Sequence, residues 1–292
     1  MRQIDEFFSS PPANTTLYHY TGIGALLGMV ETCRIWASHA YYLSDSSEIL
    51  HACDVLRGVL SKDVDNYSEE EKDFVKEFKE WLDTFRDIPH HIYVFSLSEE
   101  PSLLSQWRSY TPHGKGVSIG FSATGLKEIL KGSGFRIARC LYEPAEQREL
   151  MAGLLEKMLT TFRQRLSNLD ISGRPPTQKY YTYLEEFRGE ILQVLAIIKQ
   201  SAFSEEREWR IVSSHFPSYI GQEIKFREGA SMLLPYIEIE LSGRGKDAPL
   251  FEIVILGPSQ HAKLSMEALS NFLSNKRACH ATKNCVIPYR KW

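Results

Sequence analysis

The chain has 292 residues, a formal net charge of −3 at pH 7, 43% hydrophobic residues and 24% charged residues. This composition is that of an ordinary globular protein, and it excludes an overall basic field that would capture nucleic acid by charge alone. The five cysteines are scattered without C-x-x-C spacing, so neither a zinc knuckle nor a disulfide framework is predicted.

The first half of the chain mixes short strands with amphipathic helices. A loop rich in serine and proline over residues 9–14 leads into a predicted strand at residues 17–20, and Thr21 is expected to cap a helix that reaches about residue 32. Further strands are predicted at residues 34–38, 91–97, 117–121 and 136–142, and further helices at residues 48–60, 67–86, 103–110 and 126–130.

The second half contains two long helical segments, residues 146–169 and 178–200, separated by a Gly-Arg-Pro-Pro sequence. Strands are predicted at residues 209–212, 236–241, 251–256 and 286–287, with a helix at residues 264–273. Because strands and helices do not alternate regularly, the pattern favours an α+β fold over a doubly wound α/β sheet. We predict a single domain over residues 1–292, in which residues 145–200 form a helical insertion packed on the sheet.

Polar pairs in strand-like segments are the main functional signal. Ser96 and Ser98 are two residues apart, as are Glu206 and Glu208, and residues two apart in a strand point to the same face. Together with His19, they could line one cleft that holds a ribose and stabilises positive charge beside it.

Other site patterns are weak or absent from the sequence. Residues 114–120 are glycine-rich but lead into a strand and lack Gly-Lys-Ser/Thr, so a tight turn is favoured over a phosphate loop. There is no Gly-x-Ser-x-Gly elbow and no His-Glu-x-x-His motif. His90 and His91 are neighbours that point apart in a strand, so no metal site is predicted.

Seven short blocks resemble an uncharacterised bacterial family, one of the domains of unknown function. The resemblance spans residues 17 to about 258, with Ser44 at a position where that family usually has Asn. The blocks are Tyr18-His19-Tyr20-Thr21, Ile35-Trp36-Ala37-Ser38, Leu43-Ser44-Asp45-Ser46-Ser47-Glu48, Ser96-Leu97-Ser98-Glu99, Gln106-Trp107-Arg108-Ser109-Tyr110, residues 114–121 and Glu206-Arg207-Glu208-Trp209-Arg210-Ile211-Val212.

A looser resemblance links the chain to the ADP-ribosyltransferase superfamily. It rests on a first strand with His19, a Ser-x-Ser strand and a Glu-x-Glu that opens a later strand. The resemblance implies a split antiparallel or mixed sheet with peripheral helices, and NAD as substrate. It also implies catalytic roles for His19, Glu206 and Glu208. The residues implied to bind NAD are Tyr20, Thr21, Trp36, Ser38, Ser96, Ser98 and Tyr110.

The chemistry is consistent with these roles. Cleavage of the nicotinamide–ribose bond builds an oxocarbenium-like cation, and a fixed carboxylate beside that cation stabilises the transition state. Glu208 would hold the 2′-hydroxyl, Glu206 would face the acceptor, and His19 would donate to a ribose oxygen or the diphosphate. Tyr20, Trp36 or Tyr110 would stack on a flat ring.

Simpler interpretations remain open for each group. His19 would then be a satisfied half-buried side chain, and the serines would be strand-end caps. The acidic residues would form a surface ion-pair network with two arginines; its members would be Glu205, Glu206, Glu208, Arg207 and Arg210. Asp45 and Glu48 would be helix-start residues, and Trp107 and Tyr110 core residues, whereas Gln106 and Arg108 could reach the cleft.

The sequence therefore supports three candidate functions. The first is an NAD-dependent ADP-ribosyltransferase-like enzyme that modifies a protein or nucleic acid, in a toxin or phage-defence setting. The second is a non-catalytic module that senses a nucleotide or binds a partner, and the third is a nuclease or hydrolase that uses His19 with Asp45, Glu48 or Glu208. No apolar run approaches the roughly 20 residues of a membrane span, and we predict a cytoplasmic protein.

Overall fold

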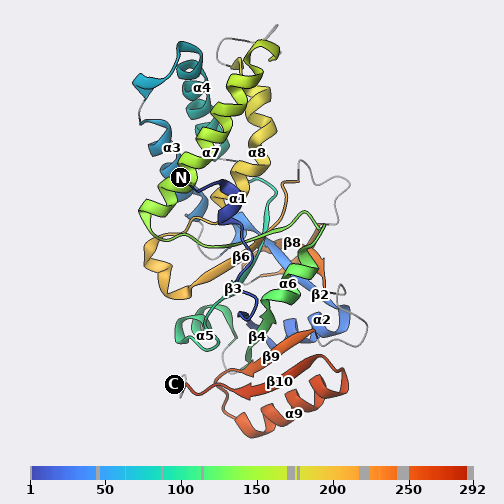
Figure 1. Cartoon of the computed structure of the whole chain (residues 1–292). Helices are drawn as coiled ribbons and strands as arrows, with labels where there is room; N and C mark the ends of the chain where they lie inside the picture. Colours follow the sequence, from blue (N-terminus) through green and yellow to red (C-terminus); the bar gives the residue numbers. More distant parts are fainter. Residues whose placement is uncertain are drawn as a thin grey trace.

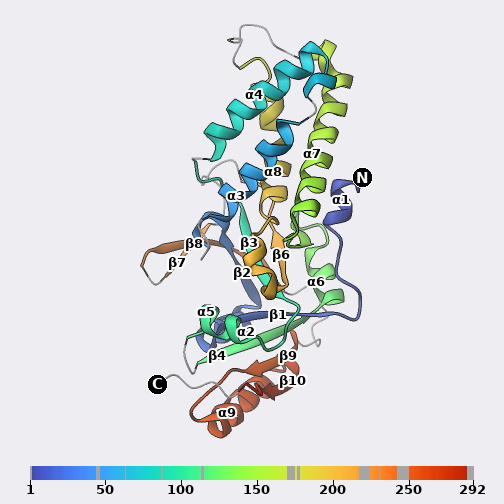
Figure 2. The same cartoon turned by 90° about the vertical axis from the view of Figure 1, so that its left-hand side faces the viewer.

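The computed structural model describes residues 2–43, 47–62, 64–86, 88–112, 115–169, 175, 178–216, 224–229, 231–241 and 250–287. Within these residues, ten strands form one mixed sheet that is covered by helices on both faces (Figures 1 and 2). The strands are β1 (Thr16–Gly22), β2 (Arg34–His39), β3 (Tyr93–Ser98), β4 (Gly116–Ser122), β5 (Arg136–Arg139), β6 (Glu208–Val212), β7 (Lys225–Glu228), β8 (Leu233–Glu240), β9 (Phe251–Leu256) and β10 (Cys279–Asn284). The predicted α+β class and mixed sheet are confirmed.

The sheet forks at β3. One edge of β3 pairs with β6 along its length, from Val94 to Ser98. The opposite edge is shared: β1 pairs with it at Tyr18↔Ser98, and β2 pairs with it only at the other end, at Ser38↔Val94 and His39↔Tyr93. From this fork, β4, β9 and β10 extend the sheet beyond β1, while β8 and β7 extend it beyond β2.

One face of the sheet packs against α2 (Ile23–Thr32), α6 (Ala123–Leu130) and α9 (Ala262–Asn275). The burial of β2 shows why, because Ile35 and Ala37 alternate with partly exposed residues and turn their side chains into this core. On β3 the same face is supplied by Phe95 and Leu97. The opposite face of β3 therefore carries Ser96 and Ser98.

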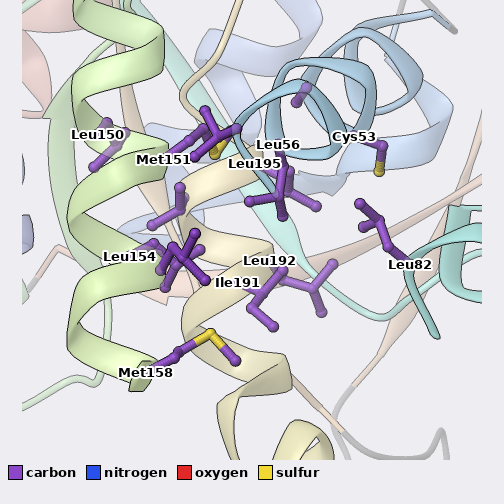
Figure 3. Packing of buried hydrophobic residues seen from close by; sticks show 14 of the residues in the cluster. Cys53, Leu56, Leu82, Leu150, Met151, Leu154, Met158, Ile191, Leu192 and Leu195 are labelled. Carbon is purple, nitrogen blue, oxygen red and sulfur yellow. The ribbon is translucent and has the colours of Figure 1, made fainter. Parts of the chain in front are cut away.

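That opposite face leads into a helical core built by α3 (Glu48–Leu60), α4 (Glu69–Arg86), α7 (Pro144–Arg165) and α8 (Tyr181–Leu195). The four helices stand together at one end of the molecule (Figure 1), and their leucine, isoleucine and methionine side chains interdigitate (Figure 3). Val94, Ala138 and Val212 of the sheet belong to the same buried cluster. The predicted pair of long helices therefore joins two earlier helices, and the division into domains stays a prediction.

The remaining helices are short: α1 (Ile4–Phe7) and α5 (Leu104–Tyr110). α5 follows β3 and contacts β1, so it lies over the sheet face that carries Ser96. Among the described residues, no helix combines the length and the apolar character needed to cross a membrane.

The structure corrects several predicted elements. Thr21 lies inside β1, and Gly22 occupies the N-cap position of α2. No strand forms at residues 286–287. β7 and β10 were not predicted, because their sequences, Lys-Phe-Arg-Glu and Cys-His-Ala-Thr-Lys-Asn, lie at the sheet margins and are largely exposed. They therefore lack the apolar alternation that identifies a half-buried strand.

Candidate functional site

A small hollow of about 70 Å³ lies beside the fork of the sheet, between β1, β3, β6 and α5. Its lining includes His19 and Tyr20 of β1, Ser96 of β3, Gln106 and Tyr110 of α5, and the charged residues Glu48, Lys199, Glu206, Glu208 and Arg210. The structure thus brings together the imidazole, one predicted hydroxyl and both predicted carboxylates.

His19 directly follows Tyr18, the residue at which β1 pairs with β3. Its Nδ1 lies 2.9 Å from the carbonyl oxygen of Ser96, and its ring stacks on Phe95 with centroids 4.3 Å apart. Burial lowers the pKa of His19 to about 4, so the ring is neutral near pH 7. Contact with a carbonyl assigns the proton to Nδ1, and Nε2 is then left as an acceptor.

The two serines have different surroundings although both point to one sheet face. Ser98 Oγ donates to the carbonyl of Glu206 at 2.7 Å and accepts from the backbone N–H of Glu100 at 3.0 Å. It fastens the chain that precedes β6 and does not line the hollow. Ser96 lies opposite Arg210 in the β3–β6 pair, and it does line the hollow.

The side chains of Glu206 and Glu208 lie close together, but not because the two residues alternate along one strand. Glu206 ends a 3-10 helix (η5, Ser201–Glu206), Arg207 has a positive φ of 43°, and Glu208 is the first residue of β6. The expectation that both carboxylates sit on a strand is therefore wrong for Glu206. The turn nevertheless places both within 2.6 Å of the same atom, Nζ of Lys199.

These contacts belong to a buried cluster of five charged side chains. Lys199 also lies 3.3 Å from Glu48, and Arg210 binds Glu208 through Nε at 2.8 Å and Glu48 through a terminal nitrogen at 2.7 Å. The Lys199 and Arg210 side chains are only 4% and 3% exposed. Three carboxylates and two cations give the cluster a formal charge of −1.

The cluster fixes the ionisation of its members. Burial by itself raises the pKa of Glu208, but Arg210 and Lys199 together outweigh burial and lower that pKa to about 2. Burial likewise lowers the pKa of Lys199, and the surrounding carboxylates more than reverse this and raise it. Glu208 is thus an ionised carboxylate at any pH near neutrality. The predicted pairing of Glu208 with Arg210 exists, but it is buried rather than on the surface. Arg207 is not part of this cluster, because it pairs with Glu100.

Lys199 is the main site residue that sequence reasoning missed. It follows α8, where an isolated bridge joins Leu141 to Ile198, and Gln147 Nε2 donates to the Lys199 carbonyl at 2.8 Å. A lysine directly after the apolar run from Leu195 to Ile198 was the available signal, because a charged residue there must be buried with partners.

The other predicted residues divide between the hollow and its surroundings. Tyr110 lines the hollow, and its hydroxyl donates to Glu206 at 3.2 Å. Tyr20 also lines it, but its hydroxyl donates to the Glu100 carbonyl and accepts from the Leu103 N–H. The residues outside the lining are Thr21, Trp36, Ser38, Ser98 and Arg108, and Ser44 and Asp45 lie outside the described residues.

A comparison with family models finds a match to part of the chain. A family model described as "Protein of unknown function (DUF2971)" matches residues 106–211, a little over a third of the chain. This confirms the resemblance to a domain family of unknown function over a segment that includes Lys199, Glu206, Glu208 and Arg210. None of the curated proteins matches the chain.

A solved structure from Thermus sp. 2.9, described as DarT in complex with ADP-ribosylated ssDNA, is similar over 96% of this chain and 97% of its own. The identity is 12% and the TM-score is 0.33. At these values, the likeness does not transfer residue roles from one chain to the other.

Proposed function

We propose that the hollow beside the fork is an active site that cleaves the nicotinamide–ribose bond of NAD and transfers ADP-ribose to a macromolecular acceptor. The observation that supports this most directly is the buried cluster with a charge of −1, in which Glu208 is held ionised beside the hollow. Its placement next to Ser96 and His19 gives the site hydroxyl and imidazole groups for a ribose.

The charge of the cluster suits the reaction. NAD has a positive nicotinamide ring, and bond cleavage moves that charge to the ribose in an oxocarbenium-like transition state. A preorganised anion in a dry site stabilises such a charge more than it stabilises the neutral parts of the substrate. Lys199 and Arg210 hold Glu208 in place and ionised, so no reorganisation of this carboxylate is needed as the charge develops.

The two carboxylates would have separate tasks. Glu208 is 7% exposed and lies deep in the cluster, where it would accept a hydrogen bond from the 2′-hydroxyl. The side chain of Glu206 is 13% exposed and contacts Tyr110, whose side chain is near the surface. Glu206 would therefore face the acceptor, which we expect to be a protein or a nucleic acid.

The hollow must widen to receive NAD. Its volume of about 70 Å³ holds roughly five water molecules, whereas pockets for small molecules typically measure about 300–1,000 Å³. The hydrogen bond between Tyr110 and Glu206 joins α5 to η5 across the hollow. We expect this contact to open when the substrate binds.

A non-catalytic module remains the second candidate, and one observation favours it. Glu48, Glu206 and Glu208 all have cationic partners already, so the cluster also satisfies itself as a structural element. Such a module would bind a nucleotide or a partner without turnover.

A toxin or phage-defence setting would suit the catalytic version, because NAD consumption or acceptor modification would harm a cell.

The direct test measures nicotinamide release from NAD and transfer of labelled ADP-ribose to single-stranded DNA and to protein acceptors. The wild type should release nicotinamide, and Glu208→Gln and Ser96→Ala should lose most of this activity. Glu238→Gln is the matched control, because Glu238 is a strand carboxylate that also binds two cations, Arg34 and Lys225, away from the hollow.

The variants must be assayed below their unfolding temperatures, with folding checked by circular dichroism. Stabilisation by NAD without nicotinamide release would favour the binding module. Neither stabilisation nor release, with the protein folded, would refute the proposed function. Equal losses in Glu208→Gln and Glu238→Gln would also contradict it.

A further inference from the structure

Arg227 of β7 is a partly buried cation that has no carboxylate partner among the described residues. A terminal nitrogen of its guanidinium donates to Ser38 Oγ of β2 at 2.9 Å, and its Nε is buried without a hydrogen-bond partner. The acid on the same sheet face, Glu238, is already bound by Arg34 and Lys225. A charge removed from water in this way is costly unless an anion compensates it.

Trp36 adds a second unsatisfied donor on this face. It lies two residues before Ser38 on β2, so the two side chains point the same way. Its ring packs against Tyr236 at 4.8 Å between centroids, and its indole Nε1 is buried without a partner in the described part of the chain. The Ser38 hydroxyl accepts from Arg227 and retains its own proton to donate.

The three groups therefore offer donors and one positive charge, with no acidic side chain among them. Buried polar groups in proteins are almost always hydrogen-bonded, so two unsatisfied buried donors on one sheet face, on strands separated only by β8, need an explanation. A ligand with several negatively charged oxygens would satisfy them together. Arginine suits phosphate oxygens in particular, because its planar fork presents several N–H groups at once.

The register of the sheet places this group beside the candidate active site. Ser38 lies directly opposite Val94, and Ser96 follows on the same face about 7 Å farther along β3. The charge of Arg227 also contributes to lowering the pKa of His19, which indicates that the two side chains are near each other. Figure 2 shows β7 and β8 extending to one side of the fork.

We propose that Arg227, Ser38 and Trp36 form a diphosphate-binding subsite on the β2–β8–β7 side of the fork. The identification of the ligand as the diphosphate of NAD rests on the proposed function, whereas binding of a diphosphate as such does not. In the assembled site, the diphosphate lies over β2 and β8, and the nicotinamide end reaches the hollow at Ser96 and Glu208.

The test measures thermal unfolding and calorimetric binding of the full-length protein with inorganic pyrophosphate, ADP and a short oligothymidine. Pyrophosphate and ADP should raise the unfolding temperature of the wild type. Arg227→Gln should weaken their binding about tenfold to a hundredfold, as expected for loss of a charged hydrogen-bonding partner. Lys225→Gln is the matched control, because it removes the same charge from the same strand, and it should bind as the wild type does.

A further measurement separates a binding role from a structural one. Without ligand, Arg227→Gln should unfold at the same or a higher temperature than the wild type, because it removes a partly buried charge that has no carboxylate partner among the described residues. If Arg227 instead supports the fold, its replacement will lower this temperature, and the subsite is refuted.

Three other outcomes would overturn the proposal. The first is that the wild type binds neither pyrophosphate nor ADP. The second is that Arg227→Gln and Lys225→Gln weaken the binding of these ligands equally. The third is that only the oligothymidine binds in an Arg227-dependent way, which would assign the site to a nucleic-acid backbone. A protein that binds ADP through Arg227 but never releases nicotinamide would uphold the subsite and refute the proposed function.

Discussion

Replacement of Glu208 by glutamine should destabilise the protein strongly even though the two side chains have nearly the same size. The carboxylate lies 2.6 Å from Lys199 and within 2.8 Å of Arg210, and it is 7% exposed. Its loss leaves two buried cations that share Glu48 and the more exposed Glu206. Removal of one member of a buried ion pair typically costs about 3–5 kcal/mol. For a chain of this length, that corresponds to a decrease in unfolding temperature of roughly 5–8 °C.

A double variant tests whether this cost comes from the charges. Lys199→Met alone leaves three carboxylates against Arg210, for a formal charge of −2, whereas Glu208→Gln alone leaves the cluster neutral but with Lys199 and Arg210 incompletely paired. Lys199→Met with Glu208→Gln restores the charge of −1. We therefore expect the double variant to be more stable than the sum of the two single losses predicts, with a coupling of about 0.5–3 kcal/mol.

Urea unfolding followed by circular dichroism measures all four proteins, and Glu238→Gln is again the control. Glu238 binds two cations whose side chains are 42% and 44% exposed, so its replacement should cost no more than about 1 kcal/mol. A loss below about 1 kcal/mol for Glu208→Gln, or strict additivity in the double variant, would refute the buried cluster as the source of the stability.

Two further predictions concern the histidines and a glycine. Burial lowers the pKa of His19 and His39 to about 4, so the unfolded chain binds more protons than the folded protein between about pH 4 and 6.5. The free energy of unfolding should therefore fall as the pH decreases through this window, and it should stay level above it. Urea midpoints measured over this pH range should show the decrease, and His39→Gln should make it smaller. In Gly257→Ala, the new Cβ would lie 2.7 Å from the ring of Trp107 and 2.9 Å from the carbonyl oxygen of Gly116. We therefore expect the free energy of unfolding to fall by about 1–3 kcal/mol. An unchanged urea midpoint would contradict this packing.

The sequence allowed the general architecture and part of the site to be predicted. Alternation on β3 correctly placed Ser96 and Ser98 on one face, and the same rule places Arg210 beside Glu208 because the two are two residues apart on β6. The resemblance to known motifs grouped His19 with these residues although it lies far away in sequence. Features that depend on a local period or on a motif could therefore be predicted from the amino-acid sequence alone.

The rest depended on tertiary contacts whose partners the local sequence does not identify. Lys199 reaches the carboxylates because a bridge from Leu141 to Ile198 fixes the chain after α8, and nothing near Lys199 in the sequence predicts that bridge. Arg227 lies on a strand whose residues are mostly exposed, so neither the strand nor its partial burial was predicted. Both residues acquire their chemical meaning from partners, or missing partners, on distant strands.

The charges on the sheet face opposite α2 are distributed in a way that fits one molecule rather than two. The cluster at the hollow is formally −1, whereas the group at Arg227, on the same face, is positive and without an acidic partner among the described residues. A bound ligand of opposite charge would reduce the free-energy cost of the buried charge in each region. NAD has a cationic ring at one end and an anionic diphosphate in its middle, so a single dinucleotide along the fork would compensate both regions at once. A simple nucleotide would compensate only the positive region, which is why ADP binding and nicotinamide release have to be measured separately.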